Sequence, residues 1–273
     1  MKIMVLAEDT SSTPAYRSEH GLSLYIETKN SKILFDTGAS NLFLENAKRL
    51  GVNIDKIDLA VISHGHYDHG GGLQAFLEEN SKAKVYIHEK AFENHYSKKS
   101  DRIVNIGLDK NLLKDDRIIL TSDIFPISHD LLLFSRVVGS EFLSSCNSSL
   151  CTAKGDSIVQ DEFEHEQSLL IKDGDHFVLI AGCAHRGIVN ILKSSVFLTC
   201  KPPSCIIGGF HLYNYSAGIS EEPAKVIQIA EFLKGTGSMY YTGHCTGIDS
   251  YNILKGIMDN QIQYLSTGTV VEI

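Results

Sequence analysis

The stretch Ser63-His64-Gly65-His66-Tyr67-Asp68-His69-Gly70-Gly71-Gly72 gathers three imidazoles and one carboxylate within six residues. The apolar, β-branched residues 57–62 come directly before it and predict a buried strand. Residues 73–77 follow the three glycines and predict a helix. The cluster therefore lies on a strand-to-helix turn, where a rigid scaffold commonly carries functional side chains. A His-rich surface loop is the alternative, but a glycine-rich elbow after a buried strand is a poor place for one.

The spacing of these side chains indicates a metal site for two ions. His64 and His66 are two residues apart, so in an extended segment their rings point to the same side and can hold one ion. Asp68 and His69 follow where the chain turns, and they can reach a second ion nearby. Imidazole and carboxylate are ligands that suit zinc, iron or manganese.

The composition of the chain is that of an ordinary globular protein. Its 273 residues are 43% hydrophobic and 21% charged, which is enough for one large α/β domain over residues 1–273. The net charge of −8 argues against a nucleic-acid surface, which needs basic stripes. No apolar run approaches the roughly 20 residues that span a bilayer, so we expect no membrane contact. The first seven residues predict a strand rather than a signal peptide, so we expect a cytoplasmic protein whose six cysteines are free thiols.

Strands alternate with helices through most of the chain, in two similar halves. Each half has a hairpin, a strand end that carries candidate ligands, and a helix, and this order predicts two sheets flanked by helices. Residues 91–96 predict a short helix, and His88 and His95 have no partner pattern, so we interpret both as structural. Residues 140–166 are a long polar run without periodicity, and we favour a lid over the site rather than disorder.

Four motifs together resemble a known family. The His-x-His-x-Asp-His arrangement of residues 64–69 resembles the metallo-β-lactamase superfamily. Three more motifs resemble its subgroup of dihydropterin-aminobenzene-phosphate synthase-like metal-dependent hydrolases: Ala-Gly-Cys-Ala-His-Arg-Gly-Ile-Val-Asn at 181–190, Gly-Gly-Phe-His-Leu at 208–212 and Thr-Gly-His-Cys-Thr-Gly at 242–247. The resemblance covers nearly the whole chain, to about Gly247, and it implies a four-layer αββα sandwich.

Every candidate ligand follows a predicted strand, which is where an α/β fold places its site. We expect two divalent metal ions, with zinc favoured and iron or manganese as alternatives. The first ion is expected on three histidines and the second on a carboxylate and two histidines: His64, His66 and His185, then Asp68, His69 and His244. A hydroxide bridging the ions would be the nucleophile, because metals lower the pKa of bound water from 15.7 to about 7.

The chain departs from the superfamily pattern at Cys183. Many members carry an Asp at the corresponding strand end, and a thiolate is a softer ligand. Cys183 is therefore either a ligand itself or a small buried residue that leaves metal binding to His185. His165 is another candidate for the third ligand, and we prefer His185 because a glycine-rich turn and a helix follow it.

Other polar residues are candidates for supporting or catalytic roles. Asp36 ends a strand, and we expect it to hold a ligand imidazole in its tautomer beneath the metals, with turn capping as the alternative. His20 precedes the first hairpin, and the resemblance leaves a substrate-facing and a structural role open. Asp68 and His211 are the predicted catalytic residues. We expect His211 to contact substrate or to donate a proton to the leaving group, with a packed strand-end histidine as the alternative.

These features predict a metal-dependent hydrolase that acts on a small anionic substrate, such as a phosphoester or a lactone. The subgroup name offers a different chemistry, the condensation of a pterin with an aminobenzene phosphate in cofactor biosynthesis. A third possibility is a non-haem iron protein for redox chemistry or sensing, because the same ligands suit iron. We expect a small molecule as the partner of the site. The sequence leaves the substrate, the native metal and the oligomeric state open.

Overall fold

The computed structural model describes all residues from Met1 to Ile273, and the chain forms two compact units. Unit 1 comprises Met1–Asn94, Ile106–Ser122 and Leu265–Ile273. Unit 2 comprises His95–Asn105 and Asp123–Tyr264. Each unit contains one seven-stranded sheet, and unit 2 also contains two smaller sheets.

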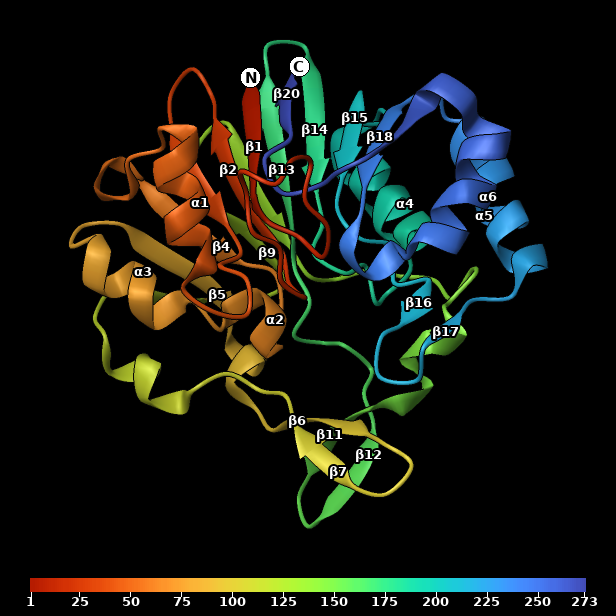
Figure 1. Cartoon of the computed structure of the whole chain (residues 1–273), viewed down its shortest axis with the longest axis horizontal. Helices are drawn as coiled ribbons and strands as arrows, with labels where there is room; N and C mark the ends of the chain where they lie inside the picture. Colours follow the sequence, from red (N-terminus) through yellow and green to blue (C-terminus); the bar gives the residue numbers. More distant parts are fainter. The chain divides into compact units, whose positions relative to one another are not determined.

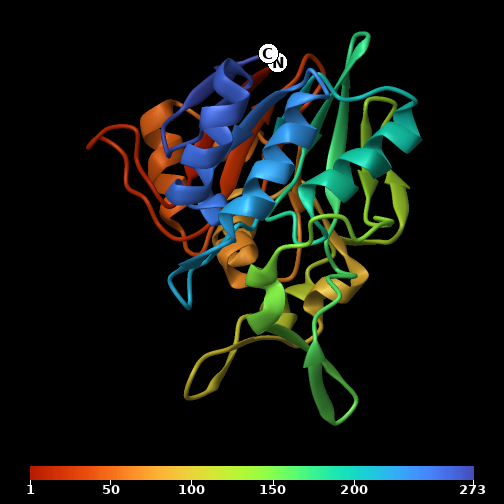
Figure 2. The same ribbon diagram turned by 90° about the vertical axis from the view of Figure 1, so that its right-hand side faces the viewer.

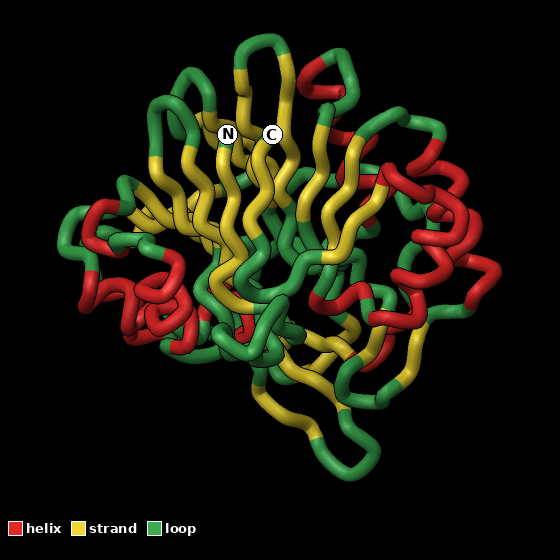
Figure 3. Tube along the Cα trace, turned by 45° about the horizontal axis from the view of Figure 1, so that its top comes forward, coloured by secondary structure: helices red, strands yellow, loops and turns green.

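The sheet of unit 1 has the strand order β20-β1-β2-β3-β4-β5-β8. Its strands are β1 Lys2–Ala7, β2 Ser23–Glu27, β3 Lys32–Phe35, β4 Leu59–Ile62, β5 Lys84–His88, β8 Ile118–Thr121 and β20 Val270–Glu272. Strands β3, β4, β5 and β8 are parallel, whereas β20, β1, β2 and β3 pair antiparallel. The amino and carboxyl termini meet on neighbouring strands, where the Met1 amino group donates to the Ile273 carbonyl at 2.7 Å (Figure 3).

Helices cover one face of this sheet. They are α1 Leu42–Leu50, α2 Tyr67–Gly70 and α3 Leu73–Glu79, with 3-10 turns at η1 Ile54–Lys56, η2 Glu89–Phe92 and η3 Lys110–Lys114. Figure 1 shows α1 and α3 on the same side of the sheet, where Phe43 and Phe76 are fully buried against alternate strand residues such as Leu34 and Ile62. The intervening strand residues are buried too, which explains why these strands are continuously apolar in sequence.

The main sheet of unit 2 has the order β19-β18-β15-β14-β13-β10-β9. Its strands are β9 Ile124–Pro126, β10 Leu131–Phe134, β13 Ser168–Asp173, β14 His176–Ile180, β15 Cys205–Ile207, β18 Met239–Thr242 and β19 Ile262–Tyr264. Strands β14, β15, β18 and β19 are parallel. The smaller sheets consist of β6 His95–Lys98, β7 Ile103–Asn105, β11 Leu150–Lys154 and β12 Ser157–Gln160, and of β16 Tyr213–Asn214 with β17 Ile219–Ser220.

Three helices cover a face of the main sheet of unit 2. They are α4 Ile188–Thr199, α5 Pro223–Lys234 and α6 Ile248–Met258, and short 3-10 turns lie at η4 Ser145–Ser149, η5 His244–Thr246 and η6 Asp259–Gln261. Figure 2 shows α5 and α6 side by side, and their buried residues Ile229 and Leu254 share one core with Ile206 and Tyr240 of the sheet. The predicted α/β architecture, with sheets flanked by helices, is therefore confirmed.

The parallel strands determine where the candidate ligands lie. In unit 1, β3 ends just before Asp36 and β4 ends just before Ser63. In unit 2, the loops that follow β14, β15 and β18 carry Cys183, His211 and His244. Because parallel strands end at the same sheet edge, each unit brings its own candidates together.

One expectation about local structure needs correction. Residues 91–96 are not a helix, because η2 ends at Phe92 and the chain then enters strand β6, which contains His95. Residues 140–166 contain regular structure, namely η4, β11 and β12, while their role as a lid stays a prediction. None of the helices combines the length and the apolar character needed to cross a membrane.

Candidate metal centre

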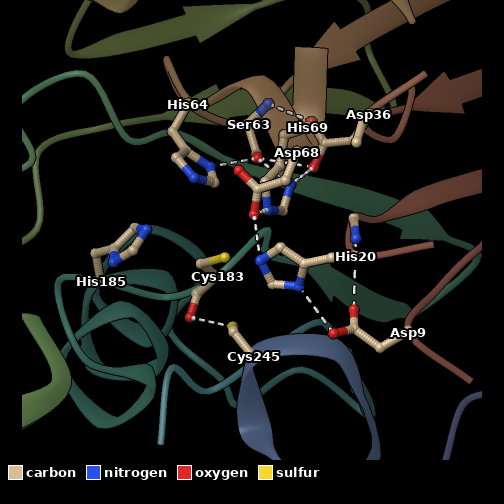
Figure 4. A network of polar contacts seen from close by, with 12 residues as sticks. Asp9, His20, Asp36, Ser63, His64, Asp68, His69, Cys183, His185 and Cys245 are labelled. Carbon is tan, nitrogen blue, oxygen red and sulfur yellow. Dashed lines mark hydrogen bonds and ion pairs between the residues drawn. The ribbon is translucent and has the colours of Figure 1, made fainter. Parts of the chain in front are cut away.

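The donor cluster of unit 1 is built on a buried carboxylate. Asp36 accepts hydrogen bonds from the Ser63 backbone N–H at 2.7 Å, from the Ser63 hydroxyl at 2.8 Å and from His69 Nδ1 at 2.6 Å (Figure 4). Asp36, Ser63 and His69 are all fully buried. Asp36 therefore joins the ends of two neighbouring strands and contacts the imidazole of His69, whose role as a metal ligand stays a prediction.

These contacts assign the tautomers of two histidines. An ionised carboxylate only accepts hydrogen bonds, so His69 carries its proton on Nδ1 and presents the lone pair of Nε2. The single hydroxyl proton of Ser63 goes to Asp36, so the 2.8 Å contact between Ser63 Oγ and His64 Nδ1 requires a proton on that nitrogen. His64 consequently presents Nε2 as well. Neutral imidazoles with an exposed Nε2 lone pair are suited to bind a divalent metal.

The other predicted donors of unit 1 lie beside these rings. The His66 ring lies 4.5 Å from the His64 ring, and the His69 ring lies 4.1 Å from it, between centroids. Asp68 Oδ2 is 3.6 Å from His69 Nε2 and 3.6 Å from His20 Nε2. Two ligand atoms bound at about 2.1 Å to one tetrahedral ion lie about 3.4 Å apart. Asp68 and His69 therefore have a separation that fits a shared ion.

His20 belongs to the same cluster. Its Nδ1 contacts Asp9 Oδ2 at 2.8 Å, and this carboxylate fixes the orientation of the ring (Figure 4). Since Asp9 accepts at Nδ1, Nε2 is the nitrogen that faces Asp68. The sequence analysis did not single out Asp9, which lies in the polar stretch after β1 and has no distinctive spacing.

His185, the preferred third histidine, is held on several sides within unit 2. Asn147 Nδ2 donates to the His185 carbonyl at 2.8 Å, and Asn147 Oδ1 lies 3.0 Å from His185 Nδ1. An amide oxygen accepts only, so His185 carries its proton on Nδ1 and presents Nε2, like His64 and His69. The ring also stacks on Phe163, with centroids 4.4 Å apart and planes at 5°.

A buried glutamate positions the backbone of His185. Glu166 accepts the backbone N–H of His185 at 2.7 Å and that of Arg186 at 2.9 Å. Burial raises the pKa of Glu166 to about 7, although the two N–H donors work in the opposite direction. Glu166 and Asn147 were missed from the sequence, because each is a single polar residue far from the loop that it supports.

Asn147 is itself anchored through η4. Glu221 accepts from the Ser145 N–H at 2.5 Å, from the Ser145 hydroxyl at 2.9 Å and from the Ser144 hydroxyl at 3.2 Å. Burial tends to raise the pKa of Glu221, but hydrogen bonds that include the Ser145 and Glu222 N–H groups outweigh it and lower the pKa to about 2. Glu221 therefore holds the first residues of η4, the 3-10 turn that contains Asn147, in place.

His165, the alternative third ligand, lies in a different arrangement. Its Nε2 contacts Asp161 Oδ2 at 3.2 Å, and His95 Nδ1 contacts the same oxygen at 3.1 Å. The two rings are 3.9 Å apart between centroids. Burial tends to raise the Asp161 pKa, but hydrogen bonds from the two histidines outweigh it and hold the pKa well below its usual range. His95, interpreted above as a structural histidine without a partner pattern, thus shares a carboxylate with His165.

The loops after strands β14, β15 and β18 of unit 2 contain residues with a left-handed backbone conformation. Ala184, His211 and His244 have positive φ values of 57°, 48° and 50°. Cys183 and Cys245 are linked by a contact from the Cys245 thiol to the Cys183 carbonyl at 3.6 Å (Figure 4). Burial tends to raise the pKa of the Cys245 thiol, but hydrogen bonding with the Cys183 side chain and the neighbouring His244 and His211 outweigh burial and hold the pKa well below its ordinary value.

The structure thus forms one donor cluster in each unit. Unit 1 brings together five predicted residues: His20, Asp36, His64, Asp68 and His69, with His66 beside His64. Unit 2 brings His185 to 4.1 Å from His211 between ring centroids, and it holds His244 directly before Cys245. The buried donors and their tautomers fit divalent metals. The joint assignment of His185 and His244 to the ions of unit 1 stays a prediction.

Comparison with known proteins agrees with this geometry. Residues 17–144 match the sequence pattern of the Metallo-beta-lactamase superfamily. A curated relative from Methanocaldococcus jannaschii, the 7,8-dihydropterin-6-methyl-4-(beta-D-ribofuranosyl)-aminobenzene-5'-phosphate synthase, is 28% identical over 289 residues, which cover 100% of this chain and 96% of the relative.

Solved structures show the same fold. Tm1679, described as a metal-dependent hydrolase of the beta-lactamase superfamily, matches with a TM-score of 0.81 at 29% identity, over 100% of this chain and 99% of its own. Zn²⁺-bound PqqB from Methylobacterium extorquens matches with a TM-score of 0.59 at 9% identity, over 100% of both chains, which is a likeness of fold. The resemblance indicated by the motifs is therefore confirmed: residues 17–144 match the pattern of the superfamily, and the chain has the metallo-β-lactamase fold.

Proposed function

We propose that this protein is a metal-dependent hydrolase with a dinuclear centre that acts on a small anionic substrate, such as a phosphoester or a lactone. The observation that carries the proposal is the network of Asp36, Ser63, His64 and His69. It fixes two buried imidazoles with the proton on Nδ1, so that Nε2 is the nitrogen suited to a metal, beside the carboxylate of Asp68. Hydrogen-bond partners that fix the tautomer and the orientation of a histidine ring are typical of metal sites.

The proposed ligand sets are those expected from the sequence: His64, His66 and His185 for one ion, and Asp68, His69 and His244 for the other. Divalent ions bound there would acidify a water molecule and polarise a substrate oxygen. Asp36 would keep its proton-accepting contact with His69 throughout, so that Nε2 stays available. Asn147 would do the same for His185. Zinc is the proposed metal, and iron or manganese would suit the same donors.

A condensation reaction is the second candidate, and one observation favours it. The curated relative that matches this chain over its whole length is named as a synthase in pterin chemistry. The same metals and histidines can support either reaction, because a fold does not determine the chemistry of its site. A substrate assay separates the two candidates.

The first test is the metal content of protein purified without added metal, together with turnover of phosphodiester, lactone and β-lactam substrates. About two ions per chain with turnover of a panel member is the expected result. Two ions without hydrolysis, combined with condensation of a pterin and an aminobenzene phosphate, would replace the hydrolase proposal by the synthase. One iron per chain with an oxygen-sensitive colour would favour the redox alternative.

The second test removes single donors. His66→Ala and Asp68→Asn should each lose an ion and nearly all turnover while the far-UV circular dichroism is retained. Matched controls are His176→Ala and Asp58→Asn, which alter exposed residues of the same types. Activity within tenfold of wild type in a metal-verified His66→Ala or Asp68→Asn sample would contradict the mechanism.

A further inference from the structure

A short segment, residues 161–166, holds the loop that carries His185, and both lie in unit 2. Glu166 accepts the backbone N–H groups of His185 and Arg186 at 2.7 Å and 2.9 Å. Arg186 Nη1 donates to the Glu162 carbonyl at 2.7 Å. These hydrogen bonds fix the backbone of the loop, so the orientation of the imidazole depends on contacts that the ring itself makes.

Phe163 makes the contact with the face of this imidazole. The two rings are stacked, with centroids 4.4 Å apart and planes at 5°. Asn147 Oδ1 contacts the edge of the His185 ring at Nδ1, whereas Phe163 covers a face. Phe163 is only 4% exposed, so the stack is shielded from water. The two contacts come from different directions, and together they determine the plane of the imidazole.

The backbone of Phe163 is held in an unfavourable conformation. Its φ is 54°, in the left-handed region that residues with a Cβ atom seldom adopt. Such a conformation persists only where the surrounding contacts determine it. The Phe163 N–H donates to Asp161 Oδ1 at 2.7 Å, and the Phe163 carbonyl accepts the Glu166 N–H at 3.1 Å. Both polar backbone groups of Phe163 are thus fixed, with its side chain against His185.

Asp161 is in turn held by two buried histidines. Its Oδ2 contacts His95 Nδ1 at 3.1 Å and His165 Nε2 at 3.2 Å. The Asp161 N–H donates to the Leu150 carbonyl at 3.1 Å. His95 lies in β6 and Leu150 in β11, which are paired strands of the four-stranded sheet of unit 2. This sheet therefore anchors the carboxylate that fixes Phe163.

The stack favours a metal-bound imidazole over a free one. The face of an aromatic ring carries partial negative charge and attracts positive charge. A divalent ion bound at Nε2 of His185 withdraws electron density from the imidazole, so the attraction between this ring and the face of Phe163 increases on binding. A contact that is stronger in the bound state raises the affinity for the ion, whereas a contact of equal strength in both states does not.

We propose that Phe163 is a positioning residue of the metal centre, which orients the His185 ring and stabilises its metal-bound form. Asp161 keeps Phe163 in place, with His95 and His165 as its supports. The inference rests on the proposed function, because it takes His185 as a metal ligand. It gives His165 a supporting role in place of the ligand role considered from the sequence.

The first test measures the Zn²⁺ affinity of the full-length protein by competition with a chromogenic chelator. Phe163→Met keeps a similar volume but removes the ring, and it should weaken binding roughly tenfold. The ring protons of His185, assigned in NMR spectra by their loss in His185→Ala, should move downfield because the ring current of Phe163 is absent. Phe134→Met is the matched control, since Phe134 is a buried phenylalanine in β10 of the same unit. This control should keep both the affinity and the His185 resonances.

A second test separates the charge on the ring from its shape. Phe163 is replaced by phenylalanines with an increasing number of ring fluorine atoms, which weaken the negative charge on the face while the stack is kept. Zn²⁺ affinity should fall stepwise along this series, while urea unfolding of the metal-free protein changes little. A residue that only fills space would give a constant affinity. The series also answers the question if Phe163→Met fails to fold.

Asp161→Ala removes the acceptor of the Phe163 N–H and should reproduce both effects of Phe163→Met. Wild-type affinity and His185 resonances in this variant would overturn the support by Asp161. An affinity of Phe163→Met within threefold of wild type, or a constant affinity along the fluorinated series, would overturn the role of Phe163. Weakened binding in His185→Ala would at the same time leave the proposed ligands intact. If His185→Ala binds Zn²⁺ as tightly as wild type, His185 is not a ligand, and the proposed ligand set fails together with this inference.

Discussion

Asp36→Asn is the substitution that tests the donor cluster of unit 1 most directly. The change keeps the size of the side chain and replaces one carboxylate oxygen by an amide nitrogen. One oxygen can still accept the Ser63 N–H, but the amide group then faces two other donors, the Ser63 hydroxyl and His69 Nδ1. To avoid donors facing donors, His69 must move its proton to Nε2, the nitrogen that would bind a metal.

The size of the effect follows from these contacts. With the proton of His69 on Nε2, the new amide can donate to Nδ1, and the Ser63 hydroxyl is the group that loses its acceptor. One buried donor without a partner costs about 1–3 kcal/mol, and we expect a loss of folding stability in this range. Changes to residues that orient a ligand histidine typically weaken metal binding 10–100-fold, and we expect a loss in this range.

Metal affinity is measured by competition with a chromogenic chelator, and stability by urea unfolding of the metal-free protein. Asp58→Asn is the matched control, because Asp58 accepts the backbone N–H of Lys32 at 2.7 Å but is exposed. The control should change stability by less than about 1 kcal/mol and leave metal affinity unchanged. Metal affinity of Asp36→Asn within threefold of wild type would refute the assignment of the His69 tautomer.

Three further predictions concern the support of the site. Asn147→Ala removes the oxygen that fixes His185 Nδ1, and chelator competition should show metal binding weakened about 10-fold; unchanged affinity would remove His185 from the ligands. The lowered pKa of Glu221 means that its stabilising effect on the fold is present above pH 4.5 and is lost as the pH falls toward 2. Urea unfolding between pH 5 and pH 2.5 should therefore show that wild type loses up to about 3 kcal/mol more folding stability than Glu221→Gln. Equal losses of stability in the two proteins would contradict this prediction. Gly71→Ala places a Cβ 2.3 Å from a backbone oxygen and should lower stability by about 2 kcal/mol or more, whereas Gly256→Ala in α6 meets no atom within 4 Å and should be neutral or stabilising; similar melting temperatures for the two variants would argue against the close approach at Gly71.

The sequence carried strong information wherever the relevant residues are close together in the chain. The donors of residues 64–69 are neighbours, and the strand and helix on either side have clear apolar patterns, so both the motif and its placement could be predicted. The second half offered the same signals at Cys183 and His185. The prediction of a helix over residues 91–96 was wrong, because β6 pairs with the sequence-distant strand β11 and this pairing outweighs a weak local helix preference.

The supporting residues could not be predicted for the same reason. Asn147 and His185 are 38 residues apart, and His95 and Asp161 are 66 residues apart, so no spacing rule connects them. Single Asn, Asp and Glu residues in polar loops are common, and nothing in their local sequence separates a residue that orients a ligand from one that faces water. Only the folded structure shows which of them are buried next to a histidine.

Residues with a left-handed backbone conformation indicate how the fold positions the candidate donors. Asp36, Ala184, His211 and His244 all have positive φ values, and each follows a strand within four residues. At about 1–2 kcal/mol for each non-glycine residue, the four conformations together cost several kcal/mol, a large share of the 5–15 kcal/mol that stabilises a typical domain. Such a cost persists only where surrounding contacts determine the backbone, and here these include the hydrogen bonds to Asp36 and the ties between Phe210 and Thr246. The positions of the donors are therefore set by the fold itself, which is what a site needs if it is to hold its geometry while metals and substrate exchange.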